Sequence, residues 1–181
     1  MQENNDKGLI IRQLMTYGAI LGSIMVVYSI IIHLTGRNGL IPDENTPMWA
    51  NLRVVIVGLG IYYSVRHLAD KILKQRLSFL KFVFFGICVG FFYSIIESCY
   101  FVIYINYISP QTKELMIQIA QKQLIEMNIS NYDEEYIRQI MNRPIAVFFG
   151  YLFSGTFGAT LYSLIFGLLY TLMGNFASPK K

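Results

Sequence analysis

Cysteine, histidine and charge are all scarce in this chain of 181 residues. It has two cysteines and two histidines, and only 14% of its residues are charged. Cys88 and Cys99 lie eleven residues apart in one apolar run, which on a helix separates them by about 16 Å, too far for a disulfide. Neither His33 nor His67 has a partner at metal-ligand spacing. We therefore expect no disulfide, no metal site and no cofactor.

Catalytic motifs are also absent from the sequence. It contains no G-x-S-x-G elbow, no H-E-x-x-H zinc motif and no phosphate-binding P-loop. A hydrolase inside a membrane needs a nucleophile with a base, or paired carboxylates, and Glu97 is the sole acidic residue within an apolar run. The positive charges are not gathered in a soluble region. We therefore expect that the protein is not an enzyme and does not bind nucleic acid.

Hydrophobic residues, in contrast, make up 54% of the chain, and the mean hydropathy is +0.44. A helix needs about 20 apolar residues to cross a bilayer core of about 30 Å. Such runs occur at about 13–34, 48–69, 82–108 and 144–176. The chain is too short for a separate soluble domain as well. The sequence therefore predicts one all-α, polytopic membrane domain over residues 1–181, with four transmembrane helices.

The connection between the third and fourth runs has its own helical pattern. Its apolar residues follow helical spacing and alternate with charged and amide side chains. We predict an amphipathic helical pair here, at about 110–128 and 131–142. The pair either lies on the bundle and the outer leaflet or docks on a partner protein.

Small residues recur every fourth position in three of the predicted membrane helices, a pattern typical of close helix packing. The first helix has Gly18 and Gly22. The third and fourth helices carry longer stripes: Gly86, Gly90, Ser94 and Ser98; Gly150, Ser154 and Gly158; and Gly155, Ala159, Ser163 and Gly167. Two stripes on the last helix predict that it touches two neighbours and lies at the centre of the bundle.

The distribution of basic residues predicts the orientation in the membrane. With four spans, the two termini and the middle connection share one side, which carries Lys7, Arg12, Arg66, Lys71, Lys74, Arg76, Lys81, Lys180 and Lys181. The opposite side carries six basic residues, which are Arg37, Arg53, Lys113, Lys122, Arg138 and Arg143. Seven acidic residues on that side balance them. The positive-inside rule therefore predicts that both termini are cytoplasmic.

Glu97 and Arg53 are the most informative polar residues of the predicted helices. At 1.5 Å per residue, Arg53 lies about 6 Å below the outer interface and Glu97 about 8 Å below it. Tyr100 shares the helix face of Glu97, and His33 ends the first helix at a similar level. We predict that Glu97, Arg53, His33 and Tyr100 form a polar cluster inside the membrane.

Three interpretations of this cluster remain open. In the first, Glu97 is structural, either paired with Arg53 or held by tyrosine hydroxyls. In the second, Glu97 binds a proton or substrate. In the third, the two charges do not meet and Arg53 extends alone to the lipid headgroups. The first interpretation predicts a non-enzymatic accessory or scaffold protein of the cell envelope. The second predicts a small proton- or ion-coupled transporter, or a subunit of one. Partners beyond the lipid bilayer are then a second copy or another membrane protein, contacted through the small-residue faces.

Several short motifs together resemble a family of small four-span membrane proteins of Bacteroidetes-type bacteria, known as a domain of unknown function. The motifs are Y-G-x-x-x-G at 17–22, S-F-x-x-F at 78–82, Y-I-N-Y-I-S-P at 104–110, the run of Gln, Lys and Glu before Met141, and the glycine-rich last helix. The resemblance covers nearly the whole chain. It implies the same four-span architecture in a bacterial cytoplasmic (inner) membrane, and it implies no activity.

Overall fold

Residues 2–35, 47–127 and 134–177 are described in the computed structural model. All regular secondary structure in these residues is helical. The elements follow in the order α1 (Gln2–Leu34), α2 (Pro47–His67), η1 (Leu68–Leu73), α3 (Phe79–Ile103), η2 (Tyr104–Ile108), α4 (Pro110–Glu126), α5 (Glu134–Met141) and α6 (Pro144–Ala177). The described part of the chain is thus all-α, as the sequence predicts.

Among the described residues, four helices are long and apolar enough to cross a membrane. The spans are Gly8–Leu34, Asn51–Leu73, Phe79–Ile108 and Pro144–Met173. The polytopic membrane fold is therefore confirmed, with the helices α4 and α5 between the third and fourth spans.

The helix boundaries differ from the predicted ones at several ends. α1 begins at Gln2, ahead of the apolar run predicted from about 13, and its candidate membrane span begins at Gly8. The π-helical turns η1 and η2 continue α2 and α3, and apolar periodicity does not distinguish such turns from an α-helix. The predicted start of the second amphipathic helix, at 131, lies outside the described residues.

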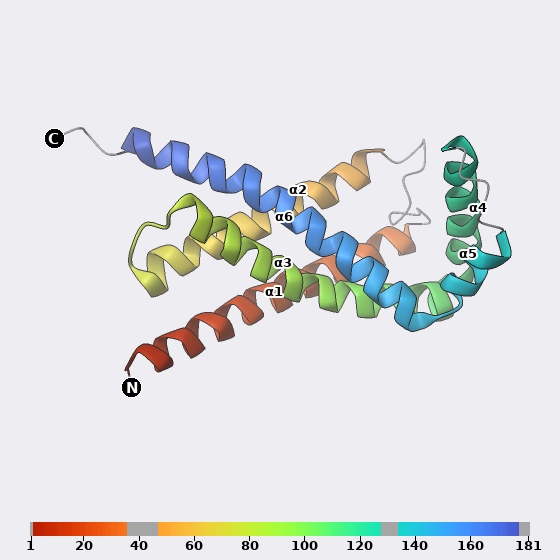
Figure 1. Cartoon of the computed structure of the whole chain (residues 1–181), viewed down its shortest axis with the longest axis horizontal. Helices are drawn as coiled ribbons and strands as arrows, with labels where there is room; N and C mark the ends of the chain where they lie inside the picture. The colour runs from red at the N-terminus through yellow and green to blue at the C-terminus, as the bar shows by residue number, and fades with distance from the viewer. Residues whose placement is uncertain (1, 36–46, 128–133, 178–181) are drawn as a thin grey trace.

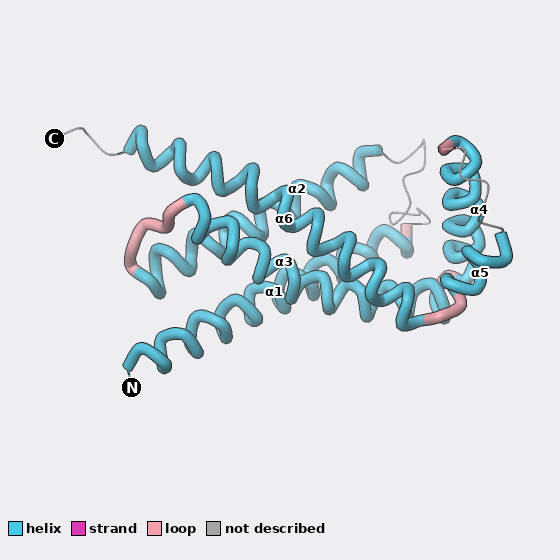
Figure 2. Tube along the Cα trace, in the orientation of Figure 1, coloured by secondary structure: helices cyan, strands magenta, loops and turns pink. Residues whose placement is uncertain are grey.

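The four long helices run alternately in opposite directions (Figure 1). Both chain ends lie at one end of the bundle, together with the connection from η1 to α3; we call this the termini end. At the opposite end, α4 runs across the long axis of the bundle beside α5; we call this the α4–α5 end. Only short loops join η1 to α3, η2 to α4 and α5 to α6 (Figure 2).

α3 is the central helix of the bundle, because it contacts α1, α2 and α6 and its apolar window is the most buried of the four described spans. The prediction that the last helix occupies the centre is wrong: 17% of the best apolar window of α6 is buried, against 39% of that of α3. α6 does touch two long neighbours, α3 and α2. One of its small-residue stripes packs on α3, whereas Gly150 of the other stripe has no atom within 4 Å of an added Cβ.

Small residues set the close contacts of α3 with both α1 and α6. A Cβ at Gly18 would lie 2.8 Å from the carbonyl oxygen of Val89, so α1 fits against the α3 backbone. On another face, Gly90 receives Ala159 of α6, and a Cβ at Gly90 would overlap the Ala159 methyl group. The predicted packing faces on the first and third helices are therefore confirmed, and both are used within the chain.

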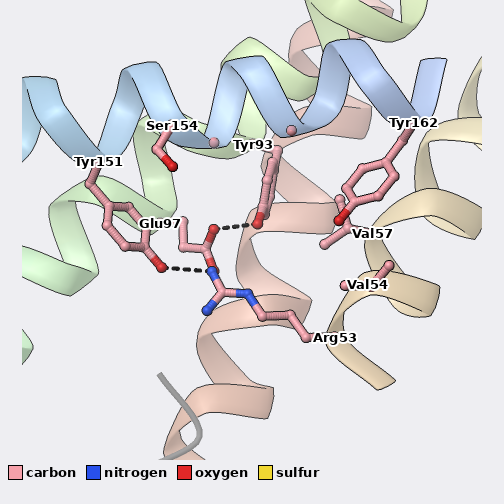
Figure 3. Close-up of a pocket in the computed structure, with 10 residues that line it drawn as sticks. Arg53, Val54, Val57, Tyr93, Glu97, Tyr151, Ser154 and Tyr162 are labelled. Carbon is pink, nitrogen blue, oxygen red and sulfur yellow. Dashed lines mark hydrogen bonds and ion pairs between the residues drawn. The ribbon is translucent and has the colours of Figure 1, made fainter. Parts of the chain in front are cut away.

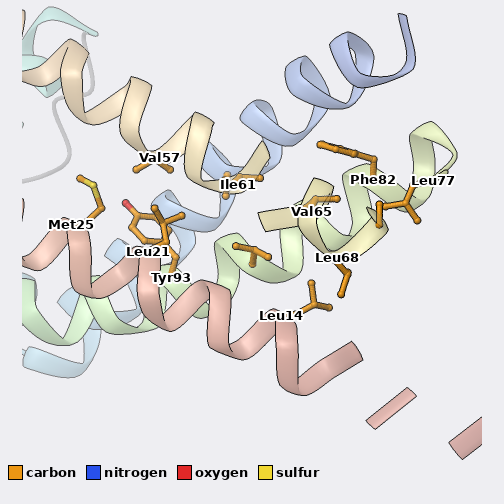
Figure 4. Close-up of a cluster of buried hydrophobic side chains, with 13 residues drawn as sticks. Leu14, Leu21, Met25, Val57, Ile61, Val65, Leu68, Leu77, Phe82 and Tyr93 are labelled. Atoms are coloured by element: carbon orange, nitrogen blue, oxygen red, sulfur yellow. The ribbon is translucent and has the colours of Figure 1, made fainter. Parts of the chain in front are cut away.

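The main hydrophobic core runs along the contact of α1, α2 and α3 toward the termini end (Figure 4). Ile61, Val65 and Phe82 are fully buried in it. A hydrogen bond of 2.7 Å between the Tyr17 hydroxyl and Nδ1 of His67 ties α1 to α2 at the same end. This packing holds α2 against α3. It thereby fixes the position of Arg53, which lies two to four turns nearer the start of α2.

Candidate functional site

Arg53 of α2 and Glu97 of α3 form an ion pair inside the bundle, between Nη2 of the guanidinium and Oε1 of the carboxylate (Figure 3). Two antiparallel helices bring them together, since Arg53 is reached from the start of α2 and Glu97 near the end of α3. The Glu97 side chain is 2% exposed and that of Arg53 is 21% exposed. The carboxylate is therefore sealed, whereas the guanidinium keeps an accessible side.

Two tyrosines add hydrogen bonds to the pair. The hydroxyl of Tyr93, one turn before Glu97 on α3, donates to Oε2 of Glu97. Nη2 of Arg53 also donates to the Tyr151 hydroxyl of α6 over 2.7 Å. The Tyr151 ring is fixed by stacking on Phe101, with 4.1 Å between the ring centroids. The network therefore links three helices, α2, α3 and α6.

A cavity of about 320 Å³ lies beside this network, between α2, α3 and α6 (Figure 3). α2 contributes Arg53 together with two valines, α3 contributes Tyr93 and Glu97, and α6 contributes small residues between two tyrosines. The full lining is Arg53, Val54, Val57, Tyr93, Glu97, Tyr151, Ser154, Gly155, Gly158 and Tyr162. The cavity thus combines a charged corner with a largely apolar wall.

Two members of the predicted cluster lie elsewhere. Nδ1 of His33 is 3.0 Å from the hydroxyl of Tyr104, at the α4–α5 end of the bundle. Tyr100 packs its ring near that of Tyr104, with 5.8 Å between centroids, and does not line the cavity. The structure therefore brings Glu97 and Arg53 together and places His33 and Tyr100 beside Tyr104 instead.

Tyr151 is a site residue that the sequence reasoning did not single out. Its signal was available, since Tyr151 is the first tyrosine of the last helix, seven residues, or about 10 Å, after Pro144. That depth is close to the one estimated for Arg53. Tyr162 on the same helix was also missed, because an isolated tyrosine among apolar residues gives no indication of the face it occupies.

The network is suited to holding helices and charges in place. The polar groups at the cavity wall are one cation, one anion and the hydroxyl groups of Ser154 and of three tyrosines, Tyr93, Tyr151 and Tyr162. Among the described residues, no group of three or more His, Cys, Asp or Glu side chains is arranged to hold a metal ion.

Fold and site together define a polytopic α-helical membrane protein with an ion pair buried between its spans. The chain belongs to the family described as "Protein of unknown function (DUF4199)", whose model matches residues 16–173. The match includes all four spans apart from the first turns of α1. The comparisons found no match among curated proteins or among solved structures. The family carries no assigned activity, so the function of the chain is unknown.

Proposed function

We propose that the protein is a non-enzymatic accessory or scaffold protein of the bacterial cytoplasmic membrane. One observation carries this proposal: both carboxylate oxygens of Glu97 are occupied inside the bundle, by Arg53 and Tyr93, and the side chain is 2% exposed. A buried ion pair in which both carboxylate oxygens are hydrogen-bonded fixes which helices pack together and in which register. The Glu97 carboxylate is thus occupied inside the bundle, and the outer surface remains for function.

The surface proposed for association is the exposed start of the Gly150 stripe on α6. Successive positions four residues apart turn by about 40° around a helix, because each residue turns by about 100°. The stripe therefore winds from Gly150 and Ser154, which are exposed, toward Gly158 at the cavity. Small exposed residues let another membrane helix approach closely. The partner is a second copy of the chain or another membrane protein.

Association is tested by purifying the tagged full-length protein from its native membrane after cross-linking and measuring its mass in mild detergent. We expect a dimer or a complex with a co-purifying membrane protein, which Gly150→Leu disrupts. Gly158→Leu, two turns farther along the same stripe, serves as the matched control and should leave the complex intact. A monodisperse monomer with no co-purifying protein would contradict the proposal.

The cavity beside Glu97 supports a second candidate, a small proton- or ion-coupled transporter. Four spans are few for a transport path, so this candidate requires a homodimer. Reconstituted vesicles with a pH-sensitive dye test it: wild type should move protons and Glu97→Gln should not, at equal protein content. Equal flux in the two proteins excludes coupling through Glu97.

A further inference from the structure

The cavity beside the ion pair lies between α2 and α6, and we call it the crevice. The two helices touch where Gly58 faces Phe166, since a Cβ on Gly58 would lie 2.6 Å from the Phe166 ring. From there the helices diverge toward the α4–α5 end (Figure 1). α3 forms the floor through Tyr93 and Glu97. The contact of Gly58 with Phe166 therefore closes the crevice toward the termini end.

The charged corner of the crevice is equipped to bind an acceptor. Both hydrogen bonds of Arg53 to described residues use Nη2. Nε and Nη1, with three N–H groups between them, are left for another acceptor. A guanidinium edge of this kind matches the oxygens of a phosphate or carboxylate. Glu97 also lines the cavity but is only 2% exposed, against 21% for Arg53, so the cation offers a ligand more surface than the carboxylate does.

The remaining walls are suited to an acyl chain. Val54 and Val57 line one side, and Gly155 and Gly158 line the other. A Cβ on Gly158 would come no closer than 4.0 Å to Tyr162, so the wall there is open. Arg53 lies about 6 Å below the interface, within reach of headgroups for an arginine side chain. A volume of about 320 Å³ is at the lower end of ligand pockets.

We propose that the crevice binds an anionic amphiphile. Its phosphate or carboxylate oxygens accept from Nε and Nη1 of Arg53, and one acyl chain lies between α2 and α6 against Val57 and Gly158. The headgroup comes from a bilayer phospholipid or from a free fatty acid, which share this chemistry. Binding here does not depend on the scaffold role, because Gly150, the residue that the association test changes, does not line the cavity.

Matched substitutions on α6 test the proposal. Gly158→Leu fills the crevice, whereas Gly150→Leu adds the same side chain where nothing lies within 4 Å and no cavity is lined. The delipidated full-length protein is unfolded thermally in neutral detergent with increasing dimyristoyl phosphatidylglycerol. We expect the lipid to stabilise wild type and Gly150→Leu equally, and Gly158→Leu to need at least about tenfold more lipid. Equal lipid dependence of the two variants overturns the proposal.

The choice of ligand separates headgroup from chain. Dimyristoylglycerol has the same chains without the phosphate, and should stabilise wild type at least about tenfold less effectively. If it is as effective as the phospholipid, Arg53 has no role in binding and the proposal fails. Sodium myristate distinguishes the sources: stabilisation at lower concentration than phosphatidylglycerol identifies a fatty acid, and the reverse order identifies a phospholipid. The result with either ligand leaves the association test unaffected, because that test measures the mass of the protein after Gly150 is changed.

Discussion

At the scale of single residues, the Arg53–Glu97 pair depends on the groups around it. Removing two charges from water costs several kcal/mol per ion, and mutual attraction offsets this only when further hydrogen bonds satisfy both ions. Tyr93 supplies a donor to the second carboxylate oxygen, and Tyr151 supplies an acceptor to the guanidinium. The tyrosines therefore belong to the stabilising unit and are not merely neighbours of it.

Removing each tyrosine hydroxyl should have an unequal effect. Tyr93→Phe leaves Oε2 of the buried Glu97 without its donor, and we expect a loss of about 1.5–3 kcal/mol, typical of hydrogen bonds to charged groups. Tyr151→Phe keeps the stacking on Phe101, and the partly exposed Arg53 can find another acceptor, so we expect about 1 kcal/mol or less. Thermal unfolding in detergent measures both.

Tyr107→Phe is the control for these two variants, because that ring is 81% exposed. It should change the free energy of unfolding by less than about 0.5 kcal/mol. A larger loss for Tyr151→Phe than for Tyr93→Phe would contradict the assignment of the carboxylate as the sealed member of the pair.

Depth along the helices was enough to anticipate the meeting of Arg53 and Glu97, because each span crosses the same slab and the rise per residue is fixed. Depth alone does not give the rotation of each helix. The end of the bundle predicted for His33 is correct, yet the side chain faces Tyr104 and not Arg53. The contribution of Tyr151 needs the packing of α6 on α3, which the sequence pattern does not supply.

At the scale of elements, α3 organises the bundle because it has small residues where α6 packs and backbone accessible to the α1 glycines. Gly90 and Ala159 meet at the closest point of α3 and α6. Such contacts replace the hydrophobic driving force, which is absent between helices surrounded by lipid. The stability of the α3–α6 contact should therefore depend on single methyl groups.

Exchanging one methyl group across this interface tests that dependence. Gly90→Ala forces two Cβ atoms into overlap, and we expect it to lower the free energy of unfolding by about 1–3 kcal/mol. The double variant Gly90→Ala/Ala159→Gly moves the methyl group to the other helix and should recover most of the loss. Thermal unfolding in one detergent compares them with Gly150→Ala, which meets nothing and should be near neutral.

If the double variant is less stable than Gly90→Ala alone, the helices do not meet at these two residues.

The stripes themselves were readable from the sequence, since small residues at every fourth position are a strong pattern. Their assignment was not, because a stripe indicates that a neighbour can approach and not that one is present. The Gly150 stripe shows the difference, and it led to the wrong prediction that the last helix is central.

At the scale of the whole molecule, the helices alternate in direction. The connection from η1 to α3, which we call the basic connection, therefore lies on the same side as the start of α1 and the end of α6. Arg76 in this connection donates to the carbonyl oxygen of Thr171 near the end of α6, over 3.0 Å. Across the bundle, Arg138 of α5 donates to Glu114 of α4 over 2.8 Å, which joins the two amphipathic helices. The positive-inside rule then predicts that the η1–α3 connection faces the cytoplasm.

Cysteine labelling in intact cells tests this orientation. Lys74→Cys lies in the basic connection and Gln123→Cys lies on α4, and both positions are exposed. A membrane-impermeant maleimide should label Gln123→Cys in intact cells and Lys74→Cys only after permeabilisation. The parent protein, whose Cys88 and Cys99 lie inside the third span, is the blank. The reverse labelling pattern would invert the topology.

The central claim is that Arg53 and Glu97 are kept for structure, and a double-mutant cycle tests it most directly. The free energy of unfolding is measured in detergent for wild type, Glu97→Gln, Arg53→Gln and the double variant. Breaking the pair from either side should cost about 3–5 kcal/mol, and the second substitution should then add little. If Glu97→Gln is neutral or stabilising, the carboxylate does not serve stability, which contradicts the scaffold account and favours transport through Glu97.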